Sequence, residues 1–165
     1  MQAVIDASFP GTSEPTFATA KDAIEHSVRR AADRADDWNS CVGETIDRVA
    51  WCGRDLTFYL AGGKAIRLCC TSSSVDWSIE TQPSPDGCAC DAESDEDVQM
   101  LSLNGTSIAW PRAKLARQRV GHEFRRFQPG GVSAYIYAAE CKILMVAVLV
   151  NSKSGEPFLY WEDAP

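Results

Sequence analysis

The chain has 165 residues, a net charge of −7 at pH 7 and 45% hydrophobic residues, which is typical of one globular domain spanning residues 1–165. The negative charge argues against a nucleic-acid binder, because counterion release requires a cationic surface. No apolar run approaches the roughly eighteen residues needed to span a bilayer, and the first residues lack the pattern of a secretory signal. We therefore expect a cytoplasmic protein with neither a membrane nor a nucleic-acid partner.

The first element predicted is one long N-terminal helix that begins at Thr16, a residue suited to cap it, and ends near Asp37. Residues 1–15 contain two prolines and a glycine, and they are expected to form an arm that leads to this helix. Apolar residues recur at steps of three and four positions, namely Phe17, Ile24, Val28, Ala31, Ala35 and Trp38. One face of the helix would therefore pack against the rest of the domain.

Strands are predicted next, at residues 42–52, 56–60, 65–70 and 75–80. Two glycines lie between the second and third of these strands, which indicates a hairpin because tight hairpin turns require positive φ angles. Apolar and polar residues alternate in the last strand, so we expect one of its faces to be wet.

Residues 81–97 interrupt the strand pattern with six carboxylates and no Lys or Arg, and we expect a long acidic loop there. A strand at residues 98–103 follows and ends in an Asn-Gly pair, the signature of a tight turn. A short helix near residues 111–119 comes next, because Pro111 suits the first helical position.

Three further strands, at residues 133–138, 143–150 and 158–161, predict an antiparallel meander. The middle strand is apolar at every position, which predicts cover on both of its faces. The last strand ends with Trp161, is apolar on both faces and lies near the C-terminus, so it is expected to be an exposed edge. A second copy of the chain would cover such an edge, and we therefore expect a homodimer.

Two stretches, residues 42–68 and 120–145, share a weak pattern. Each begins with Val-Gly and continues into a strand and a hairpin, and the hairpins align after a one-residue shift that places Phe58 over Tyr135. An internal duplication and a chance likeness of two amphipathic hairpins both stay open. Together the elements predict an α+β fold: a curved antiparallel sheet, two-layered or barrel-like, built from two hairpin-containing half-repeats and packed against the two helices.

Seven cysteines are present, and Cys69, Cys70, Cys88 and Cys90 come nearest to a metal-ligand set. Neighbouring strand residues point to opposite faces, so Cys69 and Cys70 would not converge on one ion. Zinc sites usually place about two to four residues between paired thiolates, and a single residue separates Cys88 from Cys90. We expect free thiols, no metal and no cofactor, while a four-cysteine site stays an alternative.

Catalytic motifs are weak. The acidic residues of 91–97 lack the glycine and the glutamate that would complete an EF-hand calcium loop. The Gly-Gly-Lys at residues 62–64 lacks the other residues of a phosphate-binding loop. The two histidines, His26 and His122, belong to no recognisable Ser or Cys motif. We therefore name no catalytic residue and expect that the protein is not an enzyme.

Charge is distributed unevenly, because residues 112–126 carry six cations and one carboxylate, downstream of the acidic loop. Either the loop folds over this basic stretch, or the basic residues contact a partner. The expected interaction surface comprises Arg112, Lys114, Arg117, Arg119, Arg125, Arg126 and Trp161.

The function expected from the sequence is non-catalytic binding of another protein, for example a basic protein held as an immunity protein holds a cationic toxin. The acidic charge and the lack of a catalytic or cofactor pattern support this hypothesis. The alternative is a small hydrolase or thiol enzyme in which His122 acts with Tyr135, Tyr137 or a cysteine.

Overall fold

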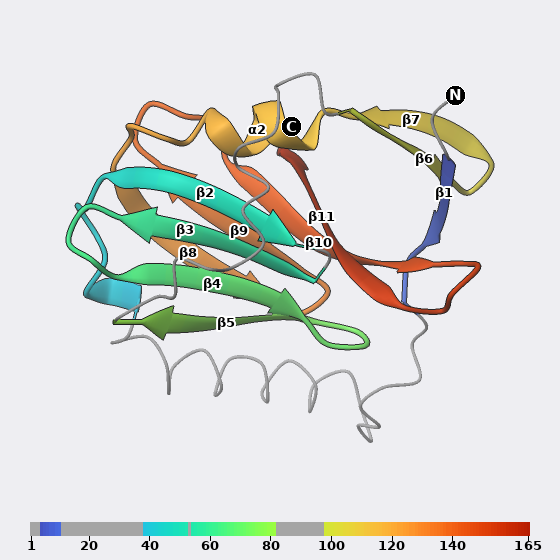
Figure 1. The fold of residues 1–165 in the computed structure, drawn as a ribbon, viewed down its shortest axis with the longest axis horizontal. Helices are drawn as coiled ribbons and strands as arrows, with labels where there is room; N and C mark the ends of the chain where they lie inside the picture. Colours follow the sequence, from blue (N-terminus) through green and yellow to red (C-terminus); the bar gives the residue numbers. More distant parts are fainter. Residues whose placement is uncertain (1–3, 11–37, 53, 82–97) are drawn as a thin grey trace.

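In a computed structural model, which describes residues 4–10, 38–52, 54–81 and 98–165, the chain forms two β-sheets that pack one over the other (Figure 1). The first sheet has four antiparallel strands that neighbour one another in chain order. These strands are β2 (Ile46–Cys52), β3 (Asp55–Leu60), β4 (Ala65–Cys70) and β5 (Val75–Glu80).

The second sheet has seven strands, and β10 (Leu144–Asn151) lies at its centre. One edge of β10 pairs with β11 (Pro157–Asp163). The other edge pairs with β9 (Ser133–Ala138) along the first half of β10 and with β1 (Val4–Ser8) at its C-terminal end. The outer strands are β8 (Phe124–Gly130) beside β9, and the hairpin of β6 (Gln99–Leu103) and β7 (Thr106–Trp110) beside β1. All pairs are antiparallel except β1 with β6. The helix α2 (Arg112–Arg117) follows β7 and contacts β11 and β2.

The predicted α+β class is wrong, because the described residues are mostly β-strand and contain one short helix and no long one. The two sheets do not close into a barrel, and the core is formed by one sheet packing on the other rather than by helices on a sheet. The predicted N-terminal helix, residues 16–37, lies outside the described residues, as does most of the acidic loop 81–97. Within the part of the chain that is described, no helix is long and apolar enough to cross a membrane.

Most predicted strands are confirmed within a few residues. The hairpin at residues 56–70 forms β3 and β4, and the meander at residues 133–161 forms β9, β10 and β11. The Asn-Gly turn joins β6 to β7 with φ angles of 53° at Asn104 and 79° at Gly105, as a tight hairpin requires. Strand β1 lies in the segment predicted to be an arm. Ala7 is its only buried side chain, so the strand lacks the alternation of apolar and polar residues that would have predicted it.

Strand β10 is covered on both faces, and the cover comes from the same chain. Leu149 and Ala147 pair with Phe158 and Tyr160, whose rings contact Trp110 at centroid distances of 6.4 and 5.1 Å. The opposite face, with Val146 and Val148, packs towards the first sheet, where the rings of Trp161 and Trp51 lie 6.1 Å apart. The expectation of a homodimer depends in part on an uncovered face of this strand, and the packing removes that part. The homodimer itself stays a prediction.

The two sheets contain the same four-strand unit, since β8, β9, β10 and β11 follow one another as β2, β3, β4 and β5 do. Equivalent residues lie 78 positions apart, as Ile46 and Phe124 do at the starts of β2 and β8. The pairs Phe58–Ile66 and Ile136–Leu144 keep the same spacing, so Phe58 corresponds to Ile136 and not to Tyr135.

Reciprocal hydrogen bonds join the two units where they meet. Gly43 N donates to Phe124 O at 2.8 Å, and Gly121 N, 78 positions later, donates to Ile46 O at 2.7 Å. Ile46 N donates to His122 O at 2.9 Å and Phe124 N to Glu44 O at 2.8 Å, with an isolated bridge between Thr45 and Glu123 at the centre. Exchanging the units leaves this set of bonds unchanged, which is the property of a local two-fold axis. That the units share an ancestor stays a prediction.

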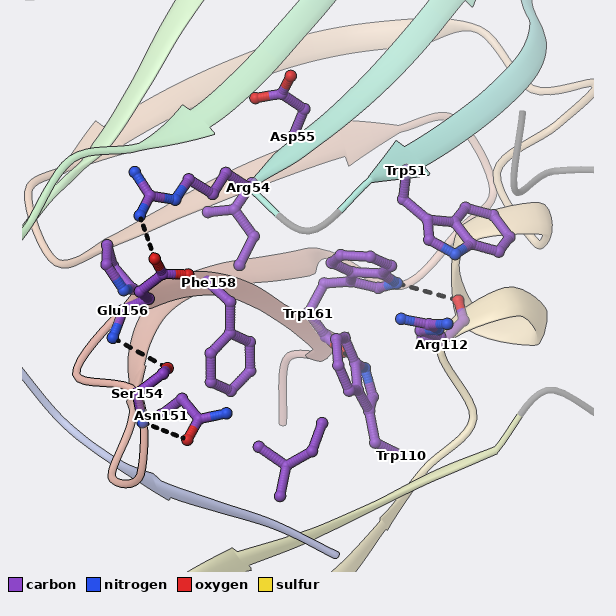
Figure 2. Close-up of a pocket in the computed structure, with 13 residues that line it drawn as sticks. Trp51, Arg54, Asp55, Trp110, Arg112, Asn151, Ser154, Glu156, Phe158 and Trp161 are labelled. Carbon is purple, nitrogen blue, oxygen red and sulfur yellow. Dashed lines mark hydrogen bonds and ion pairs between the residues drawn. The ribbon is translucent and has the colours of Figure 1, made fainter. Parts of the chain in front are cut away.

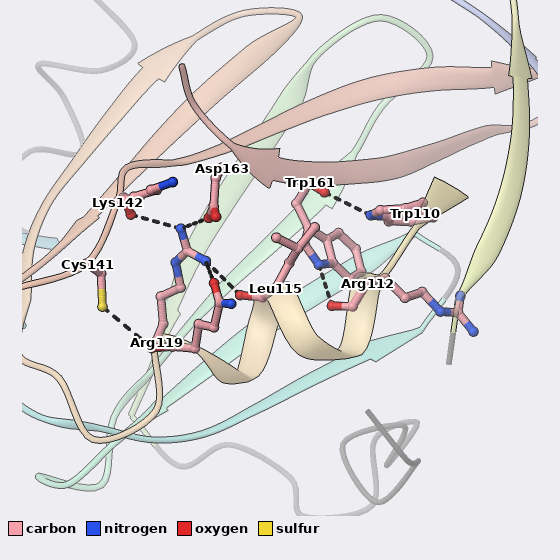
Figure 3. A network of polar contacts seen from close by, with 9 residues as sticks. Trp110, Arg112, Leu115, Arg119, Cys141, Lys142, Trp161 and Asp163 are labelled. Atoms are coloured by element: carbon pink, nitrogen blue, oxygen red, sulfur yellow. Dashed lines mark hydrogen bonds and ion pairs between the residues drawn. The ribbon is translucent and has the colours of Figure 1, made fainter. Parts of the chain in front are cut away.

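The two units differ at one pair of equivalent positions, Cys41 and Arg119, each of which follows a helical turn. Cys41 is fully buried in the first unit, and its counterpart Arg119 is 1% exposed in the second (Figure 3). The Arg119 guanidinium donates to Leu115 O at 2.7 Å and to Lys142 O at 2.8 Å, and it pairs with the Asp163 carboxylate. The side chain therefore ties α2 to β11 and to the segment before β10.

Replacing Arg119 with alanine should lower the free energy of unfolding by about 3–5 kcal/mol, because the half-buried Asp163 carboxylate and two carbonyls lose their donor and a fully buried side chain is removed. Arg125→Ala is the matched control, since Arg125 pairs with Glu123 at 3.0 Å on the exposed surface and should cost about 0–1 kcal/mol. Urea unfolding measures both. Equal effects of the two substitutions would contradict a structural role for the buried pair.

Trp161→Glu should unfold the chain itself, because Trp161 is 2% exposed in the inter-sheet core and an unpaired buried carboxylate costs several kcal/mol. Val132→Glu, at a position 41% exposed, should leave the melting temperature nearly unchanged. Circular dichroism on heating measures both variants. If Trp161→Glu melted normally and only lowered the mass in solution, Trp161 would belong to a subunit interface instead.

Candidate functional site

A pocket of about 230 Å³ opens beside β11, between the end of β2 and the N-terminal end of α2 (Figure 2). Its walls are mainly aromatic, with Trp51 from β2, Trp110 from β7, and Phe158 and Trp161 from β11. Ligand pockets for drug-sized molecules usually measure about 300–1,000 Å³. This pocket therefore suits one side chain or a similarly small group better than a large cofactor.

The three tryptophans of the pocket form one cluster that is held by hydrogen bonds to the main chain. Trp110 Nε1 donates to Trp161 O at 2.8 Å, and Trp161 Nε1 donates to Arg112 O at 3.0 Å. The rings of Trp110 and Trp161 meet edge to face, with centroids 4.9 Å apart. Trp51 Nε1 is buried and has no hydrogen-bond acceptor among the described residues. The cluster thus fixes two indoles firmly and leaves one buried donor unsatisfied.

Charged side chains surround the mouth of the pocket. Arg54 and Glu156 form an ion pair at 3.9 Å on one side of it, and both are well exposed (Figure 2). The Asp55 carboxylate is already bound by Arg67, while Arg112 lies over the Trp110 ring at 5.9 Å. Arg117, from the last turn of α2, lies 5.8 Å from the Trp51 ring. The mouth therefore carries charges of both signs, and each of its two carboxylates has an arginine partner.

Strand β11 presents main-chain groups to the pocket. Ala164 N donates to Ile143 O, and Asn151 N donates to Glu156 O, which fixes the alternation of the antiparallel ladder. Even-numbered residues of β11 therefore bond to β10, while Leu159 and Trp161 direct their main-chain groups away from it. Trp161 O accepts the Trp110 indole, but Leu159 N has no hydrogen bond to another described residue.

The first unit has a hydrogen bond to the opposite sheet at the equivalent position. Trp77 pairs with Leu68 as Trp161 pairs with Val146, so Val75 corresponds to Leu159. Val75 N donates to Gly131 O at 2.7 Å, in the turn between β8 and β9 of the opposite sheet. The position 78 residues before Gly131 is Gly53, which lies outside the described residues.

The predicted interaction surface is not one surface. Trp161 and Arg119 are buried, so neither meets a partner without unfolding. Arg125 pairs with Glu123, and Arg126 lies over the Tyr137 ring at 5.6 Å, on β8 and away from the pocket. Lys114 is exposed on α2, and only Arg112 and Arg117 reach the aromatic cluster. The predicted contact of this stretch with residues 86–97 lies outside the described residues.

The thiols of the described residues are not activated. Burial raises the pKa of Cys70 to about 11, and burial also raises the pKa values of Cys41 and Cys141. A nucleophilic cysteine requires the opposite shift, because the thiolate is the reactive form. His122 is half-buried beside the two-fold axis, and no thiol or carboxylate within the described ranges hydrogen-bonds its ring. Tyr137 donates to Gln128, as a surface tyrosine commonly does.

The described residues contain no group of three or more His, Cys, Asp or Glu that is arranged to hold a metal ion. Cys69 is half-buried and Cys70 is buried, in keeping with side chains that alternate across β4. The other two members of the four-cysteine alternative, Cys88 and Cys90, lie outside the described residues. The proposal of a zinc site therefore stands on sequence alone.

Trp51→Phe should cost less free energy of unfolding than Trp110→Phe or Trp161→Phe. The last two substitutions leave a buried main-chain carbonyl without its donor, which costs about 1–3 kcal/mol more than loss of an unbonded N–H. Urea titrations of the three variants give the comparison. A Trp51→Phe cost as large as the other two would show that the Trp51 indole has an acceptor after all.

Comparison with known proteins gives no relative for this chain. No protein-family model, curated protein or solved structure matches it. The roles of its residues are therefore inferred from its own contacts.

Proposed function

We propose that this chain is a non-catalytic protein-binding domain, and that the pocket beside β11 holds a side chain of its partner. The observation that supports this proposal most is the pocket itself, a small cavity beside β11 whose walls are mainly aromatic. Interfaces commonly bind through a few aromatic and arginine residues around an anchor pocket. Trp110, Phe158 and Arg54 supply such residues here.

The size of the pocket favours a protein partner over a metabolite. A cavity of about 230 Å³ encloses too little of a cofactor or drug-sized molecule to hold it. A protein partner needs only to insert one side chain, because the rest of its contact area lies on the surface outside.

The pocket does not favour the basic partner that the net charge suggested. Cations and carboxylates are nearly balanced over the described residues, so the net charge of −7 arises elsewhere in the chain. The charge around the pocket therefore gives no reason to expect a basic partner segment there.

No observation on the described residues favours the alternative of a hydrolase or thiol enzyme. The cysteines have raised pKa values, and His122 has no orienting carboxylate within hydrogen-bond reach in the described ranges.

A cytoplasmic location belongs to the same proposal. It is supported by four cysteines, Cys41, Cys69, Cys70 and Cys141, that form no disulfide.

Selection of random linear peptides displayed on phage against the full chain tests the proposed function. Selected peptides should bind Phe158→Ala at least about tenfold more weakly than the unmodified chain, as expected when an aromatic hot-spot residue is truncated. Phe9→Ala is the matched control, because Phe9 is 57% exposed and does not line the pocket. Its affinity should be unchanged, and melting curves check that both variants are folded. Peptides that bind both variants equally, or a selection that enriches none, would contradict the proposal.

A further inference from the structure

We infer that the partner segment is the C-terminus of a polypeptide. Its last residue places an apolar side chain between the aromatic walls of the pocket and its free carboxylate against the turn that joins β10 to β11. This inference rests on the proposed function and names the group of the partner that the pocket recognises. The observation that carries it is the orientation of the Asn151 side chain, which lines the pocket from that turn.

Hydrogen bonds inside the turn fix the orientation of the Asn151 amide. Its oxygen accepts Lys153 N at 2.9 Å and Ser154 N at 3.3 Å. An amide oxygen accepts and an amide nitrogen donates, so the opposite orientation would set the nitrogen against two N–H groups. The NH₂ group therefore faces away from the turn, and Figure 2 shows its nitrogen turned towards the other side chains of the pocket.

The turn presents donors to the pocket, because its own main chain uses its side-chain acceptors. Ser154 also lines the pocket, and its oxygen accepts Glu156 N at 3.2 Å, which leaves its O–H to donate. Asn151 contributes two N–H groups, and no acceptor among the described residues takes them. Arg54, more than half exposed beside this turn, adds a cationic donor. A group that only accepts hydrogen bonds is complementary to this side of the pocket.

A carboxylate fits these donors better than a group that must also donate. The two carboxylates that line the pocket already have partners, because Asp55 is paired with Arg67 and Glu156 with Arg54. A phenol or an amide would compete with these arginines for an acceptor, whereas a carboxylate needs donors alone. The Arg54–Glu156 pair is 3.9 Å long and exposed, so a second carboxylate can displace Glu156 from Arg54 at small cost.

The aromatic walls call for an apolar group next to that carboxylate. Phe158 and Trp110 belong to these walls, with ring centroids 6.4 Å apart. Aspartate and glutamate have short side chains that bury little apolar area beside their carboxylate. The last residue of a polypeptide carries a complete side chain and a carboxylate on the same Cα, and capture of C-terminal carboxylates is a recurring mode of peptide recognition. A cavity of about 230 Å³ has room for that one residue.

A matched pair of peptides tests the carboxylate. The probe is the peptide acetyl-Gly-Gly-Phe with a free C-terminus, and its counterpart carries a C-terminal amide. In NMR titrations of the full chain, the acid should bind at least about tenfold more tightly than the amide, because hydrogen bonds to a charged acceptor are the stronger ones. The side-chain NH₂ resonances of Asn151 should shift further with the acid than with the amide.

Asn151→Asp tests the donor. Aspartate keeps the oxygen that accepts Lys153 N and Ser154 N, but it replaces the NH₂ group with an oxygen that repels a carboxylate. The acid should bind this variant at least about tenfold more weakly, and the amide nearly as before. Asn104→Asp is the matched control, because it adds the same charge in an exposed turn that does not line the pocket. Both affinities should stay unchanged there, and melting curves check that the two variants are folded.

The outcomes separate this inference from the proposed function. The inference is overturned by equal binding of acid and amide, by no binding of the acid at millimolar concentration, or by unchanged binding of the acid to Asn151→Asp. Displayed peptides that bind through an internal residue also overturn it, and they leave the protein-binding function standing. Hydrocinnamate, which has the ring and the carboxylate without a peptide chain, should bind more weakly than the acid peptide. Equal binding would identify a free acid as the ligand instead. A display selection with free peptide C-termini that enriches nothing overturns the function as well.

Discussion

The reciprocal hydrogen bonds between residues 43–46 and 121–124 are the constraint on which the rest of the structure depends. They bring the start of β2 and the start of β8 together, and each four-stranded unit then continues away from this point on its own side of the core. Gly43 and Gly121 both have φ angles of +90°, a conformation that costs other residues about 1–2 kcal/mol. A Cβ at either position would meet no atom within 4 Å, so the requirement for glycine comes from the main chain and not from crowding.

Departures from this two-fold relation determine where the pocket forms. Arg119 replaces the small buried Cys41 and anchors β11 through Asp163, while the first unit has no such buried pair among its described residues. The β10–β11 connection, residues 152–156, is one residue longer than the β4–β5 connection, residues 71–74. The hairpin β6–β7 precedes only the second unit in the described chain, and it brings Trp110 to the edge of β11. Trp110 and the residues of β11 then line the pocket with aromatic side chains.

The sequence carried enough information to predict most strands, because alternating and apolar runs such as residues 133–138 and 144–151 are local signals. It did not reveal the class of the fold, since the weight given to helices depended on residues 16–37 and not on how the sheets pack. The pocket was missed for a different reason. Trp51, Trp110 and Phe158 come from three distant segments, so no local pattern in the sequence brings them together. Arg119 and Trp161 were assigned to a surface because a run of charges does not show which of its members is buried.

Main-chain hydrogen bonds also hold the two layers to each other, in addition to the side chains between them. The reciprocal set joins residues 43–46 to residues 121–124, and Val75 N donates to Gly131 O across the layers. Local unfolding starts where buried contacts and hydrogen bonds are fewest, so these amides should be among the last in the chain to open. The layers would then separate only when the whole fold unfolds, which makes the sandwich one cooperative unit and not two sheets that move independently.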